Sequence, residues 1–405
     1  MVNYYFPPVG GIGSIRAAKF AQYLGLGGWE PIVLAPAFSG AAPDTTIVWD
    51  ERRVVRARNL EFSRMGRRAL RIAPGSDPGA SRDGVRAALR RMAHRWIYYP
   101  DGQIGWYPFA VRAGRQAMRS SPVHAIVSSS FPITAHLVAR RLQRDSGLPW
   151  IAEFRDPWAD VTPHSAPLHR QRRDLEASLV RSADAVVTVS DTLRRLFEAK
   201  GARRVEVITN GFDPADTPPP SSPTDFVVTH LGSFYPHMQD LTAAWKALRR
   251  MRETGLLPRL RIRFVGEVPS SLLRDLSTES LDDTVERTGL VTHREALRLM
   301  SESTVLLVAG TREPHPVFDG LMPAKMFEYL GTGLPIVYVG APDADAGRLL
   351  ARQPGCYVVE PSDTDGACSA FASLREQPLY ARELEPFTRQ ALARRLASLL
   401  DAVTA

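Results

Sequence analysis

The chain has 405 residues, of which 44% are hydrophobic, and a formal net charge of +8. This length predicts two or three domains, whose cores are large enough to need no disulfide or metal. With only two cysteines, we expect neither a fold stabilised by disulfides nor a structural zinc site. No apolar run approaches the roughly 20 residues of a membrane span, so we expect no transmembrane helix. Because residues 1–10 also lack the layout of a signal peptide, we expect a cytoplasmic protein.

Short β-branched runs alternate with amphipathic helical stretches along the chain, which predicts parallel sheets built from strand–helix units. We expect six strands in the first half, at 3–6, 30–35, 125–129, 150–154, 185–189 and 204–208. Six more are expected in the second half, at 226–231, 261–265, 285–288, 304–308, 335–339 and 355–359. Between the two sets, three consecutive prolines at 218–220 exclude helix and central strand, so we expect an extended linker there.

The expected architecture is α/β, with two Rossmann-like, doubly wound domains that face each other across a cleft. The predicted parts are an N-terminal domain at 1–213 with an Arg-rich insert at 52–95, a linker at 214–224, a C-terminal domain at 225–380, and a C-terminal helix at 381–405 that can pack back on the first domain.

The segment at 52–95 holds 13 arginines, no lysine and three acids, which gives it a net charge of +10 and leaves −2 for the rest of the chain. Such a segment attracts phosphates on lipids, nucleic acids or small substrates. Residues 85–97 would form a helix with one apolar face opposite four arginines, which could lie on an anionic membrane surface. Arginines on a solvated face, and a helix that covers a sheet, remain alternatives. Apart from Phe62 and Trp96, aromatic residues are not interleaved with these arginines, so no nucleic-acid partner is expected.

Residues 7–14, Pro-Pro-Val-Gly-Gly-Ile-Gly-Ser, follow the first predicted strand and open a helix that Ser14 could cap and that runs to about Leu26. Gly11 and Gly13 let the backbone approach a ligand, and the start of the helix offers free N–H groups. This suits a phosphate, a sugar hydroxyl or a developing negative charge. Arg16 replaces the third glycine of a dinucleotide-binding fingerprint, and a plain tight turn is the alternative.

A second motif spans 320–339, where Pro323 would start a helix and the glycines at 331 and 333 would end it before a buried strand. Lys325 and Glu328 lie one turn apart on one face of that helix. A carboxylate at this position can accept two hydrogen bonds from a ribose diol, and the lysine can neutralise a diphosphate. An ordinary surface ion pair is the alternative.

Residues 4–24, which include Tyr-Tyr-Phe-Pro-Pro-Val-Gly-Gly-Ile-Gly, resemble the opening of a family 4 glycosyltransferase of the GT-B fold. The helix of Lys325 and Glu328, at 323–335, resembles the signature of that family that binds the sugar donor. Further stretches are similar to family blocks in the same order, at 149–158, 208–213, 230–235 and 289–293. The resemblance covers the chain from Tyr4 to about Glu360, apart from residues 40–100.

The resemblance implies retaining, metal-independent transfer of a sugar from a nucleoside diphosphate, with no cofactor, to a small-molecule or lipid-linked acceptor bound by the N-terminal domain. The implied catalytic residues are Gly11, Gly13, Asp156 and Asp319. The implied residues for the sugar donor are Ser233, Tyr235, Leu290, Val291, Gly320, Leu321, Lys325 and Glu328, with Glu328 on the ribose and Lys325 and Ser233 beside the diphosphate. The implied acceptor-binding residues are Arg16, Ser130 and Trp158, and no metal ligand is expected. For Asp156, a structural salt bridge to Arg155 is the alternative.

Three departures from the family pattern concern this site. Gly320, beside Asp319, stands where the family has a Glu eight positions before Glu328. The loop at 232–237 lacks the family's Arg/Lys pair that clamps phosphate, for which Arg312 or Lys325 could compensate. The His often found after the fourth strand is replaced by the serines at 128–130.

Two other functions remain open. One is a nucleotide-sugar epimerase of the same fold, and the other is a non-catalytic protein that binds nucleotide or anionic lipid. The pairs Asp343/Asp345 and Asp363/Asp365 match the short acidic motif of metal-dependent glycosyltransferases, but we interpret them as chance matches in loops. A peripheral contact with the inner face of the membrane through 52–95 is a further expectation.

Overall fold

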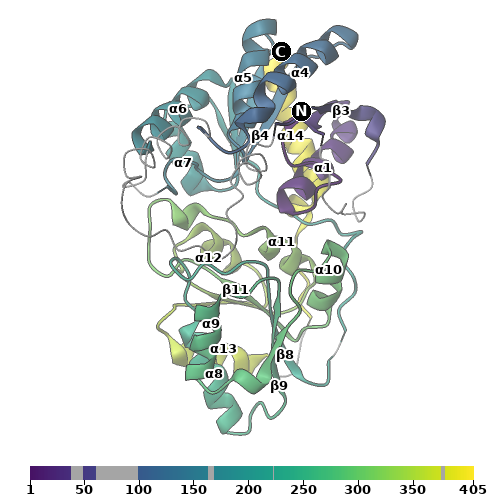
Figure 1. The fold of residues 1–405 in the computed structure, drawn as a ribbon. Helices are drawn as coiled ribbons and strands as arrows, with labels where there is room; N and C mark the ends of the chain where they lie inside the picture. The colour runs from purple at the N-terminus through teal and green to yellow at the C-terminus, as the bar shows by residue number, and fades with distance from the viewer. Residues whose placement is uncertain (38–48, 61–98, 163–167, 222, 375–378) are drawn as a thin grey trace, which may run out of the picture. The chain divides into compact units, whose positions relative to one another are not determined.

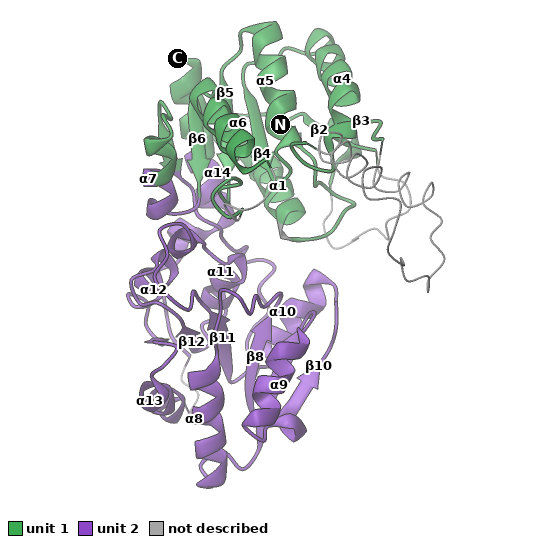
Figure 2. Cartoon of the chain, turned by 60° about the vertical axis from the view of Figure 1, so that its left-hand side comes forward, with its two compact units in different colours: residues 1–188, 196–206, 396–405 green, residues 189–195, 207–395 purple. Residues whose placement is uncertain are grey.

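The computed structural model describes residues 1–37, 49–60, 99–162, 168–221, 223–374 and 379–405. The chain forms two compact units (Figure 2). Unit 1 comprises residues 1–188, 196–206 and 396–405, and unit 2 comprises 189–195 and 207–395. The last helix, α14 (Arg389–Thr404), therefore begins in unit 2 and ends in unit 1.

Unit 1 is built on a seven-stranded sheet with the order β3-β2-β1-β4-β5-β6-β7 (Figure 1). Its pairs from β3 to β6 are all parallel. The strands are β1 (Val2–Asn3), β2 (Val33–Pro36), β3 (Val54–Ala57), β4 (Ile126–Ser130), β5 (Trp150–Phe154), β6 (Ala185–Thr188) and β7 (Val205–Val207). The helices are α1 (Ile12–Tyr23), α4 (Tyr107–Ser120), α5 (Thr134–Ser146), α6 (His169–Ser182) and α7 (Asp191–Ala199), the last of which contributes residues to both units.

Unit 2 is built on a six-stranded parallel sheet with the order β10-β9-β8-β11-β12-β13. The strands are β8 (Phe226–Leu231), β9 (Leu260–Val265), β10 (Val285–Arg287), β11 (Val305–Ala309), β12 (Ile336–Val339) and β13 (Cys356–Val359). The helices are α8 (Thr242–Glu253), α9 (Ser270–Thr278), α10 (His293–Ser301), α11 (Ala324–Gly331), α12 (Asp345–Leu350) and α13 (Thr364–Ser373). Strands β8, β11 and β12 are fully buried because helices cover the sheet, which explains their largely apolar sequences.

The expected fold of two parallel, doubly wound sheets is confirmed, and all twelve predicted strands form within a few residues of their expected bounds. One strand, β3, was not predicted. It lies at the edge of its sheet, inside the Arg-rich segment. Charged side chains are typical of edge strands, and here they hide the strand signal in the sequence. The expected basic helix at 85–97 lies outside the described residues.

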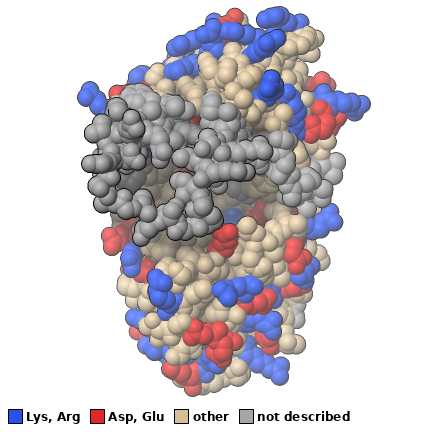
Figure 3. Space-filling model, in the orientation of Figure 1, with Lys and Arg blue, Asp and Glu red and all other residues tan. Residues whose placement is uncertain are grey.

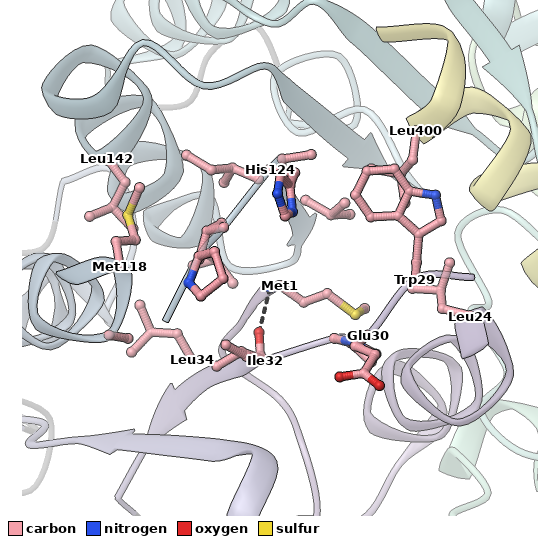
Figure 4. Close-up of a pocket in the computed structure, with 18 of the residues that line it drawn as sticks. Met1, Leu24, Trp29, Glu30, Ile32, Leu34, Met118, His124, Leu142 and Leu400 are labelled. Carbon is pink, nitrogen blue, oxygen red and sulfur yellow. Dashed lines mark hydrogen bonds between the residues drawn. The ribbon is translucent and has the colours of Figure 1, made fainter. Parts of the chain in front are cut away.

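A cavity of about 580 Å³ lies in unit 1, where strands β1, β2 and β4 begin. Its lining is mostly apolar, and the amino group of Met1 donates a hydrogen bond to the carbonyl of Ile32 at 2.7 Å beside it (Figure 4). Labelled lining residues include Leu24, Trp29, Met118, His124 and Leu400. Because α/β sheets bind ligands at the opposite edge, where the strands end, this cavity is not the candidate active site.

Charge is unevenly distributed over the described surface. On the face drawn in Figure 3, basic side chains gather over the end of unit 1 that α4 and α5 form, whereas both signs are interspersed over unit 2. Two of the arginines on these helices, Arg115 and Arg141, share Asp145 as their acidic partner. Among the described residues, no helix is both long enough and apolar enough to cross a bilayer.

Candidate active site

Each sheet has one point at which the strand order changes direction. In unit 1 this point lies between β1 and β4, and in unit 2 it lies between β8 and β11. The loops that leave the carboxyl ends of such strand pairs diverge and open a crevice, which is where α/β sheets bind their ligands. The Gly-rich turn follows β1, and the loop at 232–237 follows β8, so both predicted motifs lie at these points.

In unit 1, the Gly-rich turn ends at Gly11, whose φ of 101° favours glycine. Helix α1 begins directly after it, and the N–H groups of Ser14 and Ile15 donate to the Gly11 carbonyl. Gly11, and not Ser14, is therefore the N-cap. The first N–H groups of an α-helix have no acceptor within the helix itself. A Cβ at Gly11 would have no atom within 4 Å, so open space remains for a ligand.

Arg155, which follows β5, packs directly on this turn. Its Nε donates to the carbonyl of Ser130 at 2.8 Å, and its two terminal nitrogens would lie 3.1 Å from a Cβ at Gly13. Glycine at 13 therefore lets a guanidinium approach the start of α1. Asp156 is half-buried and forms no salt bridge with Arg155, so the structural alternative for it is wrong in that form. Burial raises the pKa of the Asp156 carboxyl, and the charge of Arg155 offsets this only in part.

The three residues implied for the acceptor are all buried. Arg16 is 2% exposed, and its guanidinium pairs with the buried Glu153 at 2.8 Å. Burial alone would raise the pKa of Glu153, but the charges of Arg16 and Arg155 outweigh it and lower the pKa. Ser130 is 1% exposed, and its hydroxyl donates to the Glu153 carbonyl at 3.3 Å. In this structure the polar groups of Arg16 and Ser130 therefore contact other buried groups of unit 1.

Trp158 is also buried, and its loop is held by an acidic side chain from α6. One carboxylate oxygen of Glu176 accepts the backbone N–H groups of Trp158, at 2.6 Å, and Ala159, at 3.0 Å. The other oxygen accepts from the Lys200 ammonium, which also pairs with Asp160. Because Glu176 is completely buried, this network fixes the loop that carries Asp156 two residues earlier.

In unit 2, Lys325 extends from the first turn of α11 to the carboxyl end of β8. Its ammonium donates to the carbonyl of Leu231 at 2.5 Å and lies 3.0 Å from Nε2 of His230. Burial lowers the pKa of Lys325 to about 7. Lys325 forms no ion pair with a carboxylate within the described residues. The ammonium therefore stands at the switch point of the sheet with two neutral partners.

His230 is the neutral partner of Lys325. Burial and the nearby charge of Lys325 lower the pKa of His230 well below its usual value, so the imidazole is neutral. Its Nδ1 lies 3.1 Å from the carbonyl of Leu307, which can only accept. We therefore assign the ring proton to Nδ1, which leaves Nε2 to accept a hydrogen bond from the Lys325 ammonium.

Glu328 lies one turn after Lys325 and is 9% exposed. Its Oε1 lies 2.9 Å from Nε2 of His293, the first residue of α10. Burial lowers the pKa of His293, but the hydrogen bond and charge of Glu328 outweigh it, and the pKa is raised. The expected helix around Lys325 and Glu328 is confirmed, with Pro323 as its N-cap and Gly331 as its last residue. The ordinary surface ion pair between the two is wrong, because each has another partner.

The other residues implied for the sugar donor lie in loops that leave β8 and β10. Ser233 and Tyr235 are exposed in the first loop, and Leu290 is 80% exposed in the second, next to Val291. The second loop leads directly into His293, so it lies beside Glu328.

At Gly320, where the family pattern has a Glu, there is little room for a side chain. A Cβ at this position would lie 2.9 Å from two carbons of Leu193, and the Gly320 carbonyl accepts from the Ser190 hydroxyl at 2.8 Å. The carboxylate of Asp319 does not substitute freely for the missing one. It accepts hydrogen bonds from the hydroxyl of Thr311 at 3.3 Å and from the N–H of His315 at 3.0 Å. These bonds stabilise the loop between β11 and α11, in which Asp319 lies.

Leu321 follows Gly320 and is half-buried. Arg312, one of the two candidates to replace the missing phosphate clamp, pairs with Asp240 at 2.9 Å. Lys325 is therefore the better placed of the two. The acidic pairs interpreted as chance matches have structural partners as well: Asp345 pairs with Arg348, and Asp363 caps α13.

Sequence reasoning missed three side chains that shape these regions, namely Arg155, His230 and His293. All three lie inside the family blocks quoted above, and each follows or ends a strand or opens a helix. Their positions at strand ends and at a helix start were the only hint in the sequence that these residues could matter. The atoms that they contact are visible only in the three-dimensional structure. Among the described residues, no three His, Cys, Asp or Glu side chains cluster in a way that could hold a metal ion.

Two family models match the chain and together cover most of it. Residues 10–211 match a glycosyl transferase 4-like domain, and residues 225–377 match the glycosyl transferases group 1 domain. A curated relative is WcaL of Escherichia coli (strain K12), which carries the name of a colanic acid biosynthesis glycosyltransferase. It is 23% identical over 265 residues, which cover 60% of this chain. The chain spans 61% of the length of that relative.

Solved structures with the same fold extend over nearly the whole chain. Sucrose-phosphate synthase from Thermosynechococcus elongatus is 13% identical, with a TM-score of 0.61, and the match covers 99% of this chain and 93% of that one. Alr3699/HepE of Anabaena, solved with UDP and glucose, is 15% identical, with a TM-score of 0.58 and coverage of 98% and 95%. The lipopolysaccharide outer core galactosyltransferase WaaB is 11% identical, with a TM-score of 0.56 and coverage of 99% and 98%. These likenesses show the fold, and with the two domain matches they show that the chain belongs to the glycosyltransferases of the GT-B type.

Proposed function

We propose that this protein transfers a sugar from a nucleoside diphosphate sugar to the hydroxyl group of an acceptor. The observation that carries the proposal is the position of Lys325. Its ammonium lies at the switch point of the second sheet, beside the neutral His230 and the Leu231 carbonyl, with no carboxylate paired to it among the described residues. A partly buried cation with only neutral partners attracts an anion, and a diphosphate supplies one. HepE of Anabaena, which has the same fold, was solved in complex with UDP, and this supports a nucleotide as the ligand.

In the proposed site, the nucleotide lies along the carboxyl edge of the second sheet. Glu328 accepts hydrogen bonds from the ribose hydroxyls, since a carboxylate has lone pairs for both members of a diol. The backbone of Leu290 and Val291 contacts the base, and Ser233 lies beside the diphosphate. Support for this arrangement comes from their placement: Leu290 and Ser233 are exposed in loops at the same sheet edge as Lys325.

The proposed reaction breaks the bond between the anomeric carbon and the oxygen of the diphosphate. Negative charge develops on the leaving diphosphate, and Lys325 stabilises it without a required metal. The acceptor hydroxyl attacks from the face that the diphosphate leaves, so the configuration is retained, and the leaving phosphate oxygen takes the hydroxyl proton. No separate base is then needed. In unit 1, the start of α1 after Gly11 and Gly13 offers helix N–H groups to the ligand, and Asp156 orients the acceptor.

For the acceptor we propose a cell-envelope glycan or lipid-linked sugar, with a specialised metabolite as the second class. The name of the relative WcaL, which refers to colanic acid biosynthesis, supports the first class. Arg16 and Ser130 are left out of the proposed acceptor site because both are buried. Arg16 forms an ion pair with Glu153, and the Ser130 hydroxyl donates to the Glu153 backbone carbonyl. The proposed membrane contact through 52–95 rests on its charge alone. At its described start, Arg52 and Arg56 already pair with Asp50 and Glu51.

One observation favours a second candidate function. The packing of Leu193 against Gly320 leaves the site without the first carboxylate of the family signature, which is compatible with a protein that binds a nucleotide sugar but does not turn it over. An epimerase of the same fold is the remaining candidate. It would change the sugar of the donor without any acceptor.

The test is to incubate the purified protein with a panel of nucleoside diphosphate sugars and to measure free nucleoside diphosphate, with and without a lipid extract as a source of acceptors. The proposal predicts release of diphosphate from one donor that requires the extract and is lost in Glu328→Ala. Binding without release in any mixture would support the non-catalytic protein. A new sugar epimer without the extract would support the epimerase.

A further inference from the structure

His293 and Glu328 come from different helices and meet at the carboxyl edge of the second sheet. His293 is the first residue of α10, and Glu328 lies in the middle of α11; both helices belong to unit 2 (Figure 2). Nε2 of the imidazole is 2.9 Å from Oε1 of the carboxylate. The histidine side chain is 22% exposed and the glutamate side chain 11% exposed, so water competes little with this bond.

The start of α10 is fixed independently of this contact. The hydroxyl of Thr292 accepts the N–H of Glu295 at 3.3 Å and caps the helix. The backbone of His293 is therefore held by the cap, and its ring reaches Glu328 from a fixed base. Only one oxygen of the carboxylate is used: Oε2 of Glu328 has no hydrogen-bond partner among the residues that the structure describes.

We infer that His293 is a positioning residue for nucleoside recognition, which holds the Glu328 carboxylate in the orientation that accepts both hydroxyls of a ribose diol. This inference rests on the proposed function, in which Glu328 binds the ribose. The Nε2–H group donates to Oε1 and fixes the plane of the carboxylate. Oε2 then accepts one hydroxyl, and the second lone pair of Oε1 accepts the other. A carboxylate without this restraint would have to be ordered by the ligand itself, and the diol would contribute less to affinity.

A positioning role of His293 and a merely structural role of the His293–Glu328 pair lead to different binding results. If the pair only joined α10 to α11, its loss would weaken every nucleotide alike, because the whole sheet edge would loosen. If His293 orients the carboxylate, its loss removes the advantage of a nucleotide that has a diol over one that lacks it. The informative quantity is therefore the ratio of the dissociation constants of a nucleotide without the diol and one with it. A general weakening of the sheet edge raises both constants equally and does not change their ratio.

The experiment measures the dissociation constants of UDP and 2′,3′-dideoxy-UDP by calorimetry, for the full chain and four variants. In the wild type we expect UDP to bind at least about tenfold more tightly than the dideoxy compound, since one lost hydrogen bond to a charged group corresponds to about that factor. In Glu328→Gln and in His293→Ala this ratio should fall to within about threefold. His293→Gln should restore most of it, because its amide nitrogen lies near the place of Nε2. Arg298→Ala is the matched control, since it removes exposed ion pairs from the same helix and leaves Glu328 alone.

Each result distinguishes the inference from the function on which it rests. A ratio that is lost in Glu328→Gln but unchanged in His293→Ala would overturn the positioning role and leave the ribose assignment intact. Equal binding of the two nucleotides by the wild type would overturn both. Loss of the ratio in His293→Gln as well as in His293→Ala would show that the contact is not a donated hydrogen bond. If His293→Ala does not fold, the comparison of His293→Gln with the wild type and Arg298→Ala decides the question.

Discussion

Lys325 provides a prediction that depends on its burial and can be measured without knowing the substrate. Burial lowers the pKa of its ammonium from 10.5 to about 7, whereas in the unfolded chain the lysine keeps its usual pKa. Between pH 7 and pH 10.5 the unfolded state therefore binds more protons than the folded state. Stability consequently rises with pH over this window, and the cost of the buried charge is fully present below pH 7.

The perturbation is Lys325→Met, which removes the titrating group and keeps a side chain of similar length. One pKa unit corresponds to about 1.4 kcal/mol, so the free energy of unfolding of the wild type should rise relative to the variant by at most about 3 kcal/mol from pH 7 to pH 9. Because the side chain keeps some contact with solvent, which screens the charge, we expect about 1–2 kcal/mol. In the variant, His230 loses its partner, which changes the free energy of unfolding. This change is the same at pH 7 and pH 9, because the pKa of His230 lies well below both values.

The assay is urea denaturation of both proteins at pH 7 and pH 9, at constant ionic strength. The difference between their unfolding free energies should change with pH in the stated direction. A difference that is the same at both pH values would refute a buried, titrating ammonium. The affinity for UDP should fall in the wild type over the same range, because the diphosphate binds the charged form. Lys325→Arg, whose side chain stays protonated, should show a flatter profile.

Three further predictions concern the site and its support. Glu328→Ala should lower the affinity for the nucleotide by about 1–3 kcal/mol, measured by calorimetry, and unchanged affinity would contradict the ribose assignment. Gly320→Glu should lower the free energy of unfolding by about 1–3 kcal/mol because the new side chain meets Leu193, and a stable, more active variant would show that the packing is not the reason for the glycine. Glu176→Leu should cost about 3–5 kcal/mol in denaturation experiments, since it leaves the ammonium of Lys200 with Asp160 alone; a loss below 1 kcal/mol would contradict the loop-fixing role.

The fold could be predicted from the sequence because its signals are local. Buried parallel strands read as largely apolar runs, and the strands predicted from them form in the structure. The prolines at 218–220 exclude a helix there, but they lie inside unit 2, whose main segment begins at residue 207. Strand β3 escaped prediction because its neighbours are arginines, whose charge masks a short edge strand. The start of α1 was placed at Ser14 on residue preference, but Gly11 caps it, because the chain there needs a positive φ that serine adopts with difficulty.

The site could be predicted only in outline. The spacing of Lys325 and Glu328 predicts that they share one face of a helix, and the structure confirms this helix. Their role in binding stays a prediction. Their partners, His230 and His293, come from strands and helices more than 30 residues away, so no local pattern connects them. Arg16 is a contrasting case. The family resemblance implies contact with the acceptor, whereas the structure buries its guanidinium against Glu153, a long-range contact that no local pattern reveals.

The most direct test of the account is a crystal structure of the protein with UDP bound. The account predicts the diphosphate within hydrogen-bonding distance of the Lys325 ammonium and both ribose hydroxyls on the Glu328 carboxylate, with His293 still on Oε1. UDP bound elsewhere, for example in the cavity where β1, β2 and β4 begin, with Lys325 and Glu328 free of it, would contradict the account.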